Sequence, residues 1–476
     1  MTARRLLALV TLVTVLLAAC EKEDRFPQPK ETDTEQPGEQ PGEEPGEKPG
    51  EQPGEQPGEQ PGEQPGEQPG EQPGEQPGEQ PGEQTGGEQP GEQPGEQPGE
   101  QPGGEQPGEQ PGEQPEVKGP FDLSVLARPL GEVTILTSGT WLQNTTVMQS
   151  FGLPGDGTMY AVQVAGSGQK HKLNVTHKGI TANNNKTKMQ LTFFGHGSNI
   201  VVERDAAGTD WLWVGCFGTN TYYKREAPDN VHCTSNQTVA RVRYQAGKEL
   251  KADDVDDQWY IPGWKNVHAA IDFDARQIAF FGYNSNGSSG FFRVYDLDAA
   301  LALPKKTVTL ALQIVRGPSE DYPLTPQSFQ ATVHDLSALT PLATIPLVSA
   351  TWTGYPYNFG TGDNQGFEIR EGRIYHFHGA GNDSDPSKAC ESVVSVFDIA
   401  TGLLVEQHRV MAVASIPDLA AANLTDYGFM ESEGIKIYGE TLYLGYTTKK
   451  TGDTHRYVTI LQYPLPRKAA GSITTE

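Results

Sequence analysis

The sequence predicts an all-β fold, a five-bladed β-propeller, behind a long N-terminal tether. Residues 121–465 contain many short runs rich in Val, Ile, Tyr, Phe and Trp, separated by Gly, Asn, Asp and Pro. No convincing amphipathic helix longer than two turns interrupts these runs, which is typical of an all-β chain. One apolar strand recurs five times in this region, and such a recurrence indicates a propeller built from repeated sheets.

The charge of the chain is distributed unevenly. The 476 residues carry a formal net charge of −26. Residues 31–116 hold 24 acidic side chains and one Lys, so most of the acidity lies there and residues 117–476 are close to neutral. Neither part is basic, so no electrostatic attraction to a phosphate backbone is expected, and we expect no nucleic-acid partner.

Residues 1–19 resemble a bacterial lipoprotein signal peptide. Arg4 and Arg5 precede an apolar run that ends at Ala19 and is too short to span a bilayer core of about 30 Å. The run ends Leu-Ala-Ala-Cys, which resembles a lipobox, and this resemblance implies that Cys20 becomes the lipidated N-terminus. Acyl chains on Cys20, palmitate among them, would anchor the chain to a lipid bilayer. An ordinary signal peptide with an incidental Cys is the alternative.

Residues 20–34 form the predicted lipidated N-terminal segment. The acidic cluster at 21–24 resembles the surface-export signals of lipoproteins in the Bacteroides group, although it also suits the solvated start of a linker. We therefore expect a protein anchored to the bacterial outer membrane or cell surface and facing outwards.

Residues 35–116 form a tether that repeats Glu-Gln-Pro-Gly and contains almost no apolar side chain. Pro at every fourth position excludes helix and sheet, and nothing in the repeat can bury enough surface to offset the entropy of ordering. A disordered spacer is expected, and a repeat that binds a partner through avidity is the alternative.

The propeller domain is predicted at residues 117–466, followed by a C-terminal tail at 467–476. The recurring strand lies at 159–164, 211–216, 277–282, 373–378 and 441–446. Another strand precedes each copy, at 147–153, 198–203, 268–273, 365–370 and 433–438. A third follows, at 172–177, 240–244, 291–297, 393–399 and 457–463. Outer strands are visible only at 188–193, 306–313 and 403–410.

The last unit lacks an outer strand. Residues 121–126 or 132–137, ahead of the first unit, could supply it and close the ring, which would remove exposed sheet edges. Residues 314–350 carry strand-like runs of their own, so a sixth, irregular blade is the alternative to five.

Three short stretches resemble one family of propeller domains: Thr146–Phe151, Phe194–Gly197 and Glu431–Gly434. This family includes receptor-binding proteins of staphylococcal phages, teichoic acid biosynthesis protein C-like proteins and helveticin-type bacteriocins. The resemblance spans nearly all of 121–465 and implies five blades. Phage members recognise wall glycopolymers and helveticins kill related bacteria, whereas this chain differs from them by its lipid anchor and tether.

Polar residues near the starts of the innermost strands are the first candidate site. Inner strands of a propeller converge on the axis, so these side chains can meet at a channel mouth and bind sugar hydroxyls. The predicted ligand-binding residues are Gln149, Gln163, His196, His268, Gln365, Glu431 and Glu433. The alternative is that they bind water and loop backbone inside the channel.

No cofactor and no metal are expected. His196, His268 and Glu433 could supply imidazole and carboxylate ligands, but no spacing in the chain resembles a sequential metal motif. The acidic loops at 253–257 and 382–385 lack the Gly and the terminal Glu of a calcium loop, so they are interpreted as solvated.

Aromatic residues in Gly/Pro/Asp-rich segments are the second candidate surface, because exposed rings stack on sugar faces. The predicted platform consists of Trp259, Tyr260, Trp264, Trp352, Tyr355 and Tyr357. The alternative is that these rings cap blades and seal loops.

The four cysteines suit an exported protein. Cys216 ends one recurring strand and Cys233 follows 17 positions later, so a disulfide between them would close one loop. Cys390 is left over, and no local motif marks it as a catalytic thiol.

These patterns favour a surface-displayed, non-enzymatic propeller that binds a glycan or an anionic glycopolymer. The first alternative is a surface bacteriocin of helveticin type. The second is a propeller glycoside hydrolase, which needs paired carboxylates. Its candidates are Glu203, Asp272, Glu368, Glu431 and Glu433, but their offsets within the repeats do not match.

Overall fold

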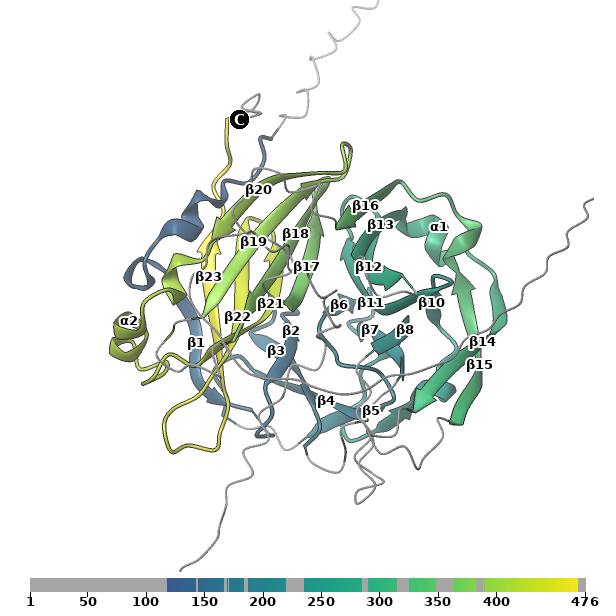
Figure 1. The fold of residues 1–476 in the computed structure, drawn as a ribbon, viewed down its shortest axis with the longest axis horizontal. Helices are drawn as coiled ribbons and strands as arrows, with labels where there is room; N and C mark the ends of the chain where they lie inside the picture. The colour runs from purple at the N-terminus through teal and green to yellow at the C-terminus, as the bar shows by residue number, and fades with distance from the viewer. Residues whose placement is uncertain are drawn as a thin grey trace, which may run out of the picture. The chain divides into compact units, whose positions relative to one another are not determined.

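The computed structural model describes residues 118–142, 144–166, 169, 171–183, 187–219, 235–284, 290–314, 325–347, 363–381, 388 and 390–469. The described residues form a β-propeller, and Figure 1 shows its sheets around a common centre. The predicted signal peptide, lipidated segment and repeat tether lie outside the described residues, as does the tail beyond 469.

The described strands form five sheets, one per blade, and the strands of each blade run in order from the axis outwards. Blade 1 contains β2 (Met148–Gly152), β3 (Thr158–Val164), β4 (Lys172–Gly179), β5 (Lys188–Thr192) and β9 (Glu249–Lys251). Blade 2 contains β6 (Ile200–Arg204), β7 (Asp210–Thr219), β8 (Ser235–Arg243), β10 (Gln258–Tyr260), β15 (Thr325–Asp335) and β14 (Lys305–Ile314).

The other three blades have four strands each. Blade 3 contains β11 (Trp264–Asp272), β12 (Gln277–Asn284), β13 (Gly290–Asp296) and β16 (Ala343–Leu347). Blade 4 contains β17 (Asp363–Arg370), β18 (Arg373–Ala380), β19 (Glu391–Asp398) and β20 (Leu403–Arg409). Blade 5 contains β21 (Met430–Tyr438), β22 (Thr441–Thr448), β23 (Tyr457–Pro464) and β1 (Thr134–Trp141).

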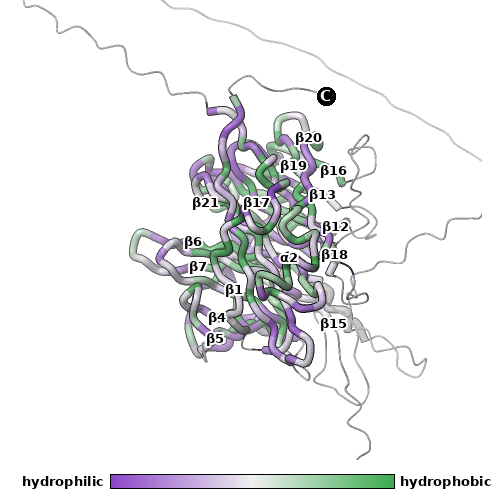
Figure 2. The backbone as a smooth tube through the Cα atoms, turned by 90° about the vertical axis from the view of Figure 1, so that its left-hand side faces the viewer, coloured by the Kyte–Doolittle hydropathy of each residue, from purple (hydrophilic) through white to green (hydrophobic). Residues whose placement is uncertain are grey.

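The innermost strands close into a ring. β2 contacts β6, β6 contacts β11, β11 contacts β17, β17 contacts β21, and β21 contacts β2 again. The central strands are apolar on both faces, so each sheet must pack against a neighbour on either side. Between blades 3 and 4, for example, the rings of Phe281, Phe292 and Phe367 meet at centroid distances of 5.1 to 6.2 Å. A side view shows apolar and polar residues interleaved throughout the blades (Figure 2).

The predicted closure of the ring by residues 132–137 is confirmed, because β1 pairs antiparallel with β23 and gives blade 5 its outer strand. The alternative closing segment, 121–126, is wrong: a 3-10 helix, η1 (Leu123–Ala127), lies there instead. Its apolar side chains are buried in a core cluster with residues of blades 4 and 5. The N-terminal strand thus completes the C-terminal blade and covers the edge of β23.

The five-blade interpretation is confirmed, and the sixth blade is not formed by the described residues. β15 pairs parallel with β10 and antiparallel with β14, which extends the sheet of blade 2. The stretch 306–313, predicted as the outer strand of the third unit, therefore belongs to blade 2. β16 occupies the outer position of blade 3. Stacking of His334 on the buried Trp259 ring, at 4.9 Å, holds β15 against blade 2.

The described N-terminal end lies on the face where the inner strands finish. Arg467 binds Glu371 in the β17–β18 turn and Glu440 in the β21–β22 turn, at 2.8 Å each. It also donates to the Gly119 carbonyl at 3.0 Å, and Phe121 bridges to it. Both described ends therefore meet on the turn face, opposite the starts of the inner strands.

Removing the closing strand should unfold the domain. A chain that starts at residue 142 lacks β1 and η1, which exposes the edge of β23 and removes five buried apolar residues: Phe121, Leu123, Val125, Leu126 and Leu130. Their burial contributes on the order of 10 kcal/mol, comparable with the stability of a whole domain. We expect aggregation or loss of a cooperative thermal transition. A chain that starts at residue 117 is the control and should keep the transition; equal stability of both chains would contradict closure by β1.

Candidate functional site

The predicted polar residues lie at irregular points of the inner strands. Register shifts interrupt the pairing of β2 between Met148 and Ser150 and that of β11 between Lys265 and His268. Equivalent shifts occur in β17, between residues 364 and 367, and in β21, between 432 and 435. A β-bulge re-aims the side chains at the extra residues. The sequence therefore places Gln149, Gln365 and Glu433 in bulges near the starts of three inner strands, and His268 directly after the fourth shift.

Two glycines bring these strands together at the axis. Gly366 and Gly434 have φ values of 115° and 141°, where other residues are strained. A Cβ at position 366 would lie 3.2 Å from Asn199 Oδ1 and 3.6 Å from the Gly434 Cα. Blades 2, 4 and 5 thus approach within van der Waals contact at the level of the bulges.

The ring residues differ in burial. Gln149, His268, Gln365 and Glu433 are buried, whereas His196 and Glu431 are half-buried. Burial, helped by the nearby His196, lowers the pKa of His268 to about 3, so its imidazole is neutral at pH 7. Its Nε2 lies 3.0 Å from Asn266 Oδ1.

The carboxamide of Gln163 binds the backbone of the segment before β2. Its Nε2 donates to the carbonyls of Thr146, at 2.6 Å, and Asn144, at 3.1 Å, while its Oε1 accepts from the Asn144 amide. Both the nitrogen and the oxygen of the carboxamide therefore hold the segment that leads into β2. Gln163 therefore positions that segment, and its predicted contact with a ligand stays a prediction.

An ion pair lies beneath the bulges and was not predicted from the sequence. Lys436 Nζ lies 2.5 Å from Glu368 Oε1 and 3.4 Å from Asn199 Oδ1, and all three residues are buried. Asn199 Nδ2 donates to the carbonyls of Ala269 and Phe367. Burial raises the pKa of Glu368, which the ammonium opposes. One sequence signal was available: each charged residue stands two positions after the bulge glycine of its strand.

The inner-strand carboxylates Glu203 and Asp272 also have cationic partners. Glu203 accepts from Arg241 at 2.8 and 2.9 Å and from the Trp213 indole at 2.8 Å. Burial alone would raise the pKa of Glu203, but these hydrogen bonds hold it below its usual value. Asp272 binds Arg370 at 3.2 Å. These two carboxylates stabilise blade contacts and turns, so they are poor candidates for an acid/base pair.

The exposure predicted for the aromatic platform is wrong for Trp259 and Trp264. Trp259 and Trp264 are 1% and 7% exposed, because they lie in β10 and at the start of β11 and not in loops. The Trp259 indole packs on Trp213 at 4.4 Å and donates to the Ala300 carbonyl. Tyr260 is half-buried. The remaining predicted members lie outside the described residues: Trp352, Tyr355 and Tyr357.

The cysteine predictions stay open. Cys216 is buried, and its predicted partner Cys233 lies outside the described residues, as does Cys20. Cys390 is buried with its Sγ 3.3 Å from the Ser392 hydroxyl and 3.6 Å from that of Ser432. The disulfide between Cys216 and Cys233 therefore remains a prediction.

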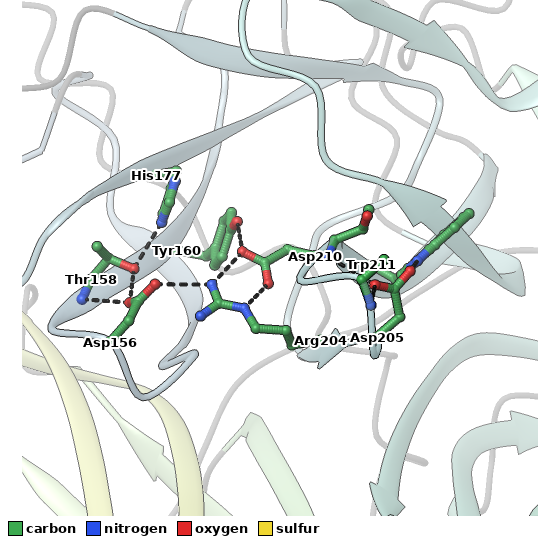
Figure 3. Close-up of polar contacts among 10 residues, drawn as sticks. Asp156, Thr158, Tyr160, His177, Arg204, Asp205, Asp210 and Trp211 are labelled. Carbon is green, nitrogen blue, oxygen red and sulfur yellow. Dashed lines mark hydrogen bonds and ion pairs between the residues drawn. The ribbon is translucent and has the colours of Figure 1, made fainter.

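A second polar cluster joins blades 1 and 2 on the turn face (Figure 3). Arg204 binds Asp210 at 2.7 and 2.9 Å and Asp156, in the β2–β3 turn, at 2.9 Å. The Tyr160 hydroxyl donates to Asp210 at 2.6 Å, and its ring stacks on His177 at 4.3 Å. These charged and aromatic groups are engaged with one another, so the cluster fastens the two blades.

The described part of the chain contains neither a candidate metal site nor a candidate membrane-spanning helix. No group of three or more His, Cys, Asp or Glu side chains there is placed to hold a metal ion. No helix there is long and apolar enough to cross a membrane.

The chain matches no known family model and no curated protein. Distant solved structures include a proposed glycoside hydrolase from Bacteroides ovatus ATCC 8483, 12% identical, covering 72% of this chain and 96% of that one, with a TM-score of 0.30. Another is the WD40 β-propeller domain of Doa1, 9% identical, covering 69% and 97%, with a TM-score of 0.23. The β-propeller domain of the trilobed protease from Pyrococcus furiosus is 8% identical, covering 66% and 95%, with a TM-score of 0.23. At these identities and TM-scores, no activity can be inferred for this chain from the solved structures. The assignment of the fold rests on the pairing of its own strands.

Breaking the axial ion pair should destabilise the ring. Lys436→Met leaves the Glu368 carboxylate buried without its cation, which should lower the free energy of unfolding by about 3–5 kcal/mol in urea denaturation. The double variant Lys436→Met/Glu368→Leu removes both charges and should recover most of that loss. As a control, Arg276→Met breaks the exposed pair with Asp298, which solvent screens, and should change the free energy of unfolding little. A Lys436→Met cost no larger than the control's would contradict the structural role of the pair.

Proposed function

We propose that the chain is a lipid-anchored, surface-displayed propeller that binds a glycan or an anionic glycopolymer without turning it over. The observation that carries this proposal is the set of polar side chains near the starts of the inner strands. Four of these side chains lie in or next to the bulges of inner strands, towards the face opposite the described N-terminal end.

The position of the N-terminal end suits display on a surface. The described chain begins on the turn face, beside Gly119 and Arg467. If Cys20 carries lipid and residues 35–116 act as a spacer, a tether of that composition reaches on the order of 50 to 250 Å. The face with the polar ring is then free to turn away from the anchoring membrane towards an external polymer.

The chemistry of the ring suits sugars. Amides of Gln149 and Gln365 and the neutral imidazole of His268 can both donate and accept, as hydroxyl groups require. Concave sites fix orientation with a few such groups. Many copies on one membrane would add avidity to a weak single-site affinity. The resemblance to phage proteins that recognise wall glycopolymers supports the same ligand class.

The alternatives share a recognition step and differ in the event after it. Hydrolysis is the weaker of them, because Glu203, Asp272 and Glu368 are engaged with Arg241, Arg370 and Lys436. Antagonism of related bacteria, as in helveticins, would use the same recognition step and would be detected as loss of viability in sensitive strains exposed to the purified protein.

Binding should depend on the ring. We expect the chain from Glu21 onward to show saturable binding on an array of bacterial glycans and wall polymers. Glu433→Gln and Gln365→Ala should each weaken that binding roughly tenfold, since each alters a buried hydrogen-bonding group. Glu132→Gln, at an exposed position outside the ring, makes the same chemical change as Glu433→Gln and should leave affinity unchanged. No saturable binding by the unaltered chain would refute the proposal.

A further inference from the structure

A buried guanidinium without an acidic partner lies on the same face as the ring. Arg456 directly precedes β23 and is 7% exposed. Its Nε donates to the Thr145 carbonyl over a long 3.4 Å, and its guanidinium lies 4.5 Å above the Phe429 ring. Among the described residues its Nη1 has no hydrogen-bond partner, and no carboxylate forms an ion pair with it. Buried charges are normally paired, so this guanidinium requires an explanation.

A second buried donor without a partner lies beside it. Asn144 stands next to Thr145, whose carbonyl accepts from Arg456, and the Asn144 Nδ2 is also buried without a hydrogen-bond partner in the described part of the chain. The Leu142 amide donates to the Arg456 carbonyl at 2.9 Å, which keeps the two segments together. Gln163 fixes the backbone of Asn144 from the other side.

Strand directions place both donors on the face where the inner strands begin. The β22–β23 loop, which ends at Arg456, and the β1–β2 loop, which contains Asn144, both reach the face where the inner strands begin. The β1–β2 loop continues into β2 and Gln149. The junction of blades 5 and 1 thus offers, on this face, two buried donors without a partner among the described residues.

Acidic side chains of the neighbouring loops are already used. Asp453 accepts from the amide and Nδ1 of His455 and from the Tyr457 hydroxyl. Asp426 accepts from the amide and hydroxyl of Thr451. Neither carboxylate is paired with Arg456.

We propose that Arg456 and Asn144 form a subsite for an acidic group of the ligand, a carboxylate or a phosphate. This inference deepens the proposed binding function and rests on it for the rest of the ligand. A guanidinium presents a planar fork that matches either group, and a carboxamide adds one more donor. Because one long hydrogen bond and one ring hold Arg456, its side chain can turn towards an incoming anion without breaking a strong contact.

The test compares anions with a neutral sugar on the chain from Glu21 onward. Calorimetric titration and thermal shift with sodium glucuronate, inorganic phosphate and glucose, all at one ionic strength, should show binding of at least one anion and none of glucose. Binding of glucuronate alone would indicate that the acidic group of the ligand is a carboxylate. Binding of phosphate alone would indicate a phosphoryl group. Binding of both would indicate that the subsite accepts either group. Binding of neither anion would overturn the proposal.

Variants separate a ligand role from a structural role. Arg456→Met should weaken anion binding roughly tenfold or more and leave the ligand-free melting temperature unchanged or raised, because it removes an unpaired buried charge. Arg128→Met, at an exposed position, is the matched control and should change neither value. Unchanged anion affinity in Arg456→Met, or a lowered melting temperature of the ligand-free variant, would overturn the proposal.

If Arg456→Met fails to fold, Asn144→Ala keeps the guanidinium and should still weaken anion binding several-fold. Unchanged affinity in that variant would also contradict the subsite. The glycan array distinguishes this inference from the proposed function. Saturable binding of neutral glycans alone would leave the function standing and remove the subsite. Anion binding through Arg456 without binding of any glycan would leave the subsite standing and remove the proposed function.

Discussion

The close approach of the inner strands at the axis is the constraint on which the rest of the molecule depends. Gly366 admits the side chain of Asn199 and the backbone of Gly434, and the Lys436–Glu368 ion pair fills the space below them. Below the bulges the axis is packed and charged, whereas at the bulges the inner strands carry two buried amides, one buried imidazole and one buried carboxylate. The same irregularity that lets five sheets converge therefore also positions the candidate ligand-binding groups.

Much of this arrangement could be predicted from the sequence, because the recurring strand has one apolar pattern in every blade. The closing strand was also predictable, since the last unit lacked a partner. The assignment of outer strands was not, because β14 and β15 pair with blade 2 through β10, a contact set by Trp259 and His334 far apart in the chain. The burial of Trp259 was missed because its Gly- and Asp-rich neighbours in the sequence suggested an exposed loop.

The site was predictable only in part. Position within each repeat predicted that Gln149, His268, Gln365 and Glu433 lie near the starts of inner strands, and the structure has them there; their contact with a ligand stays a prediction. It could not show that Gln163 uses its carboxamide to hold a neighbouring loop, nor that Arg456 is buried without a carboxylate. Both facts depend on the folding of the β1–β2 loop, which meets the β22–β23 loop although their sequences lie about 300 residues apart.

We propose that a ligand binds over the polar side chains at the starts of the inner strands, with Arg456 on the same face, opposite the described N-terminal end. The most direct measurement is a crystal structure of the domain soaked with an acidic oligosaccharide. We expect the sugar over the starts of β2, β11, β17 and β21, with its acidic group against Arg456. A sugar bound on the turn face or at the outer strands, and not over the starts of the inner strands, would contradict this proposal.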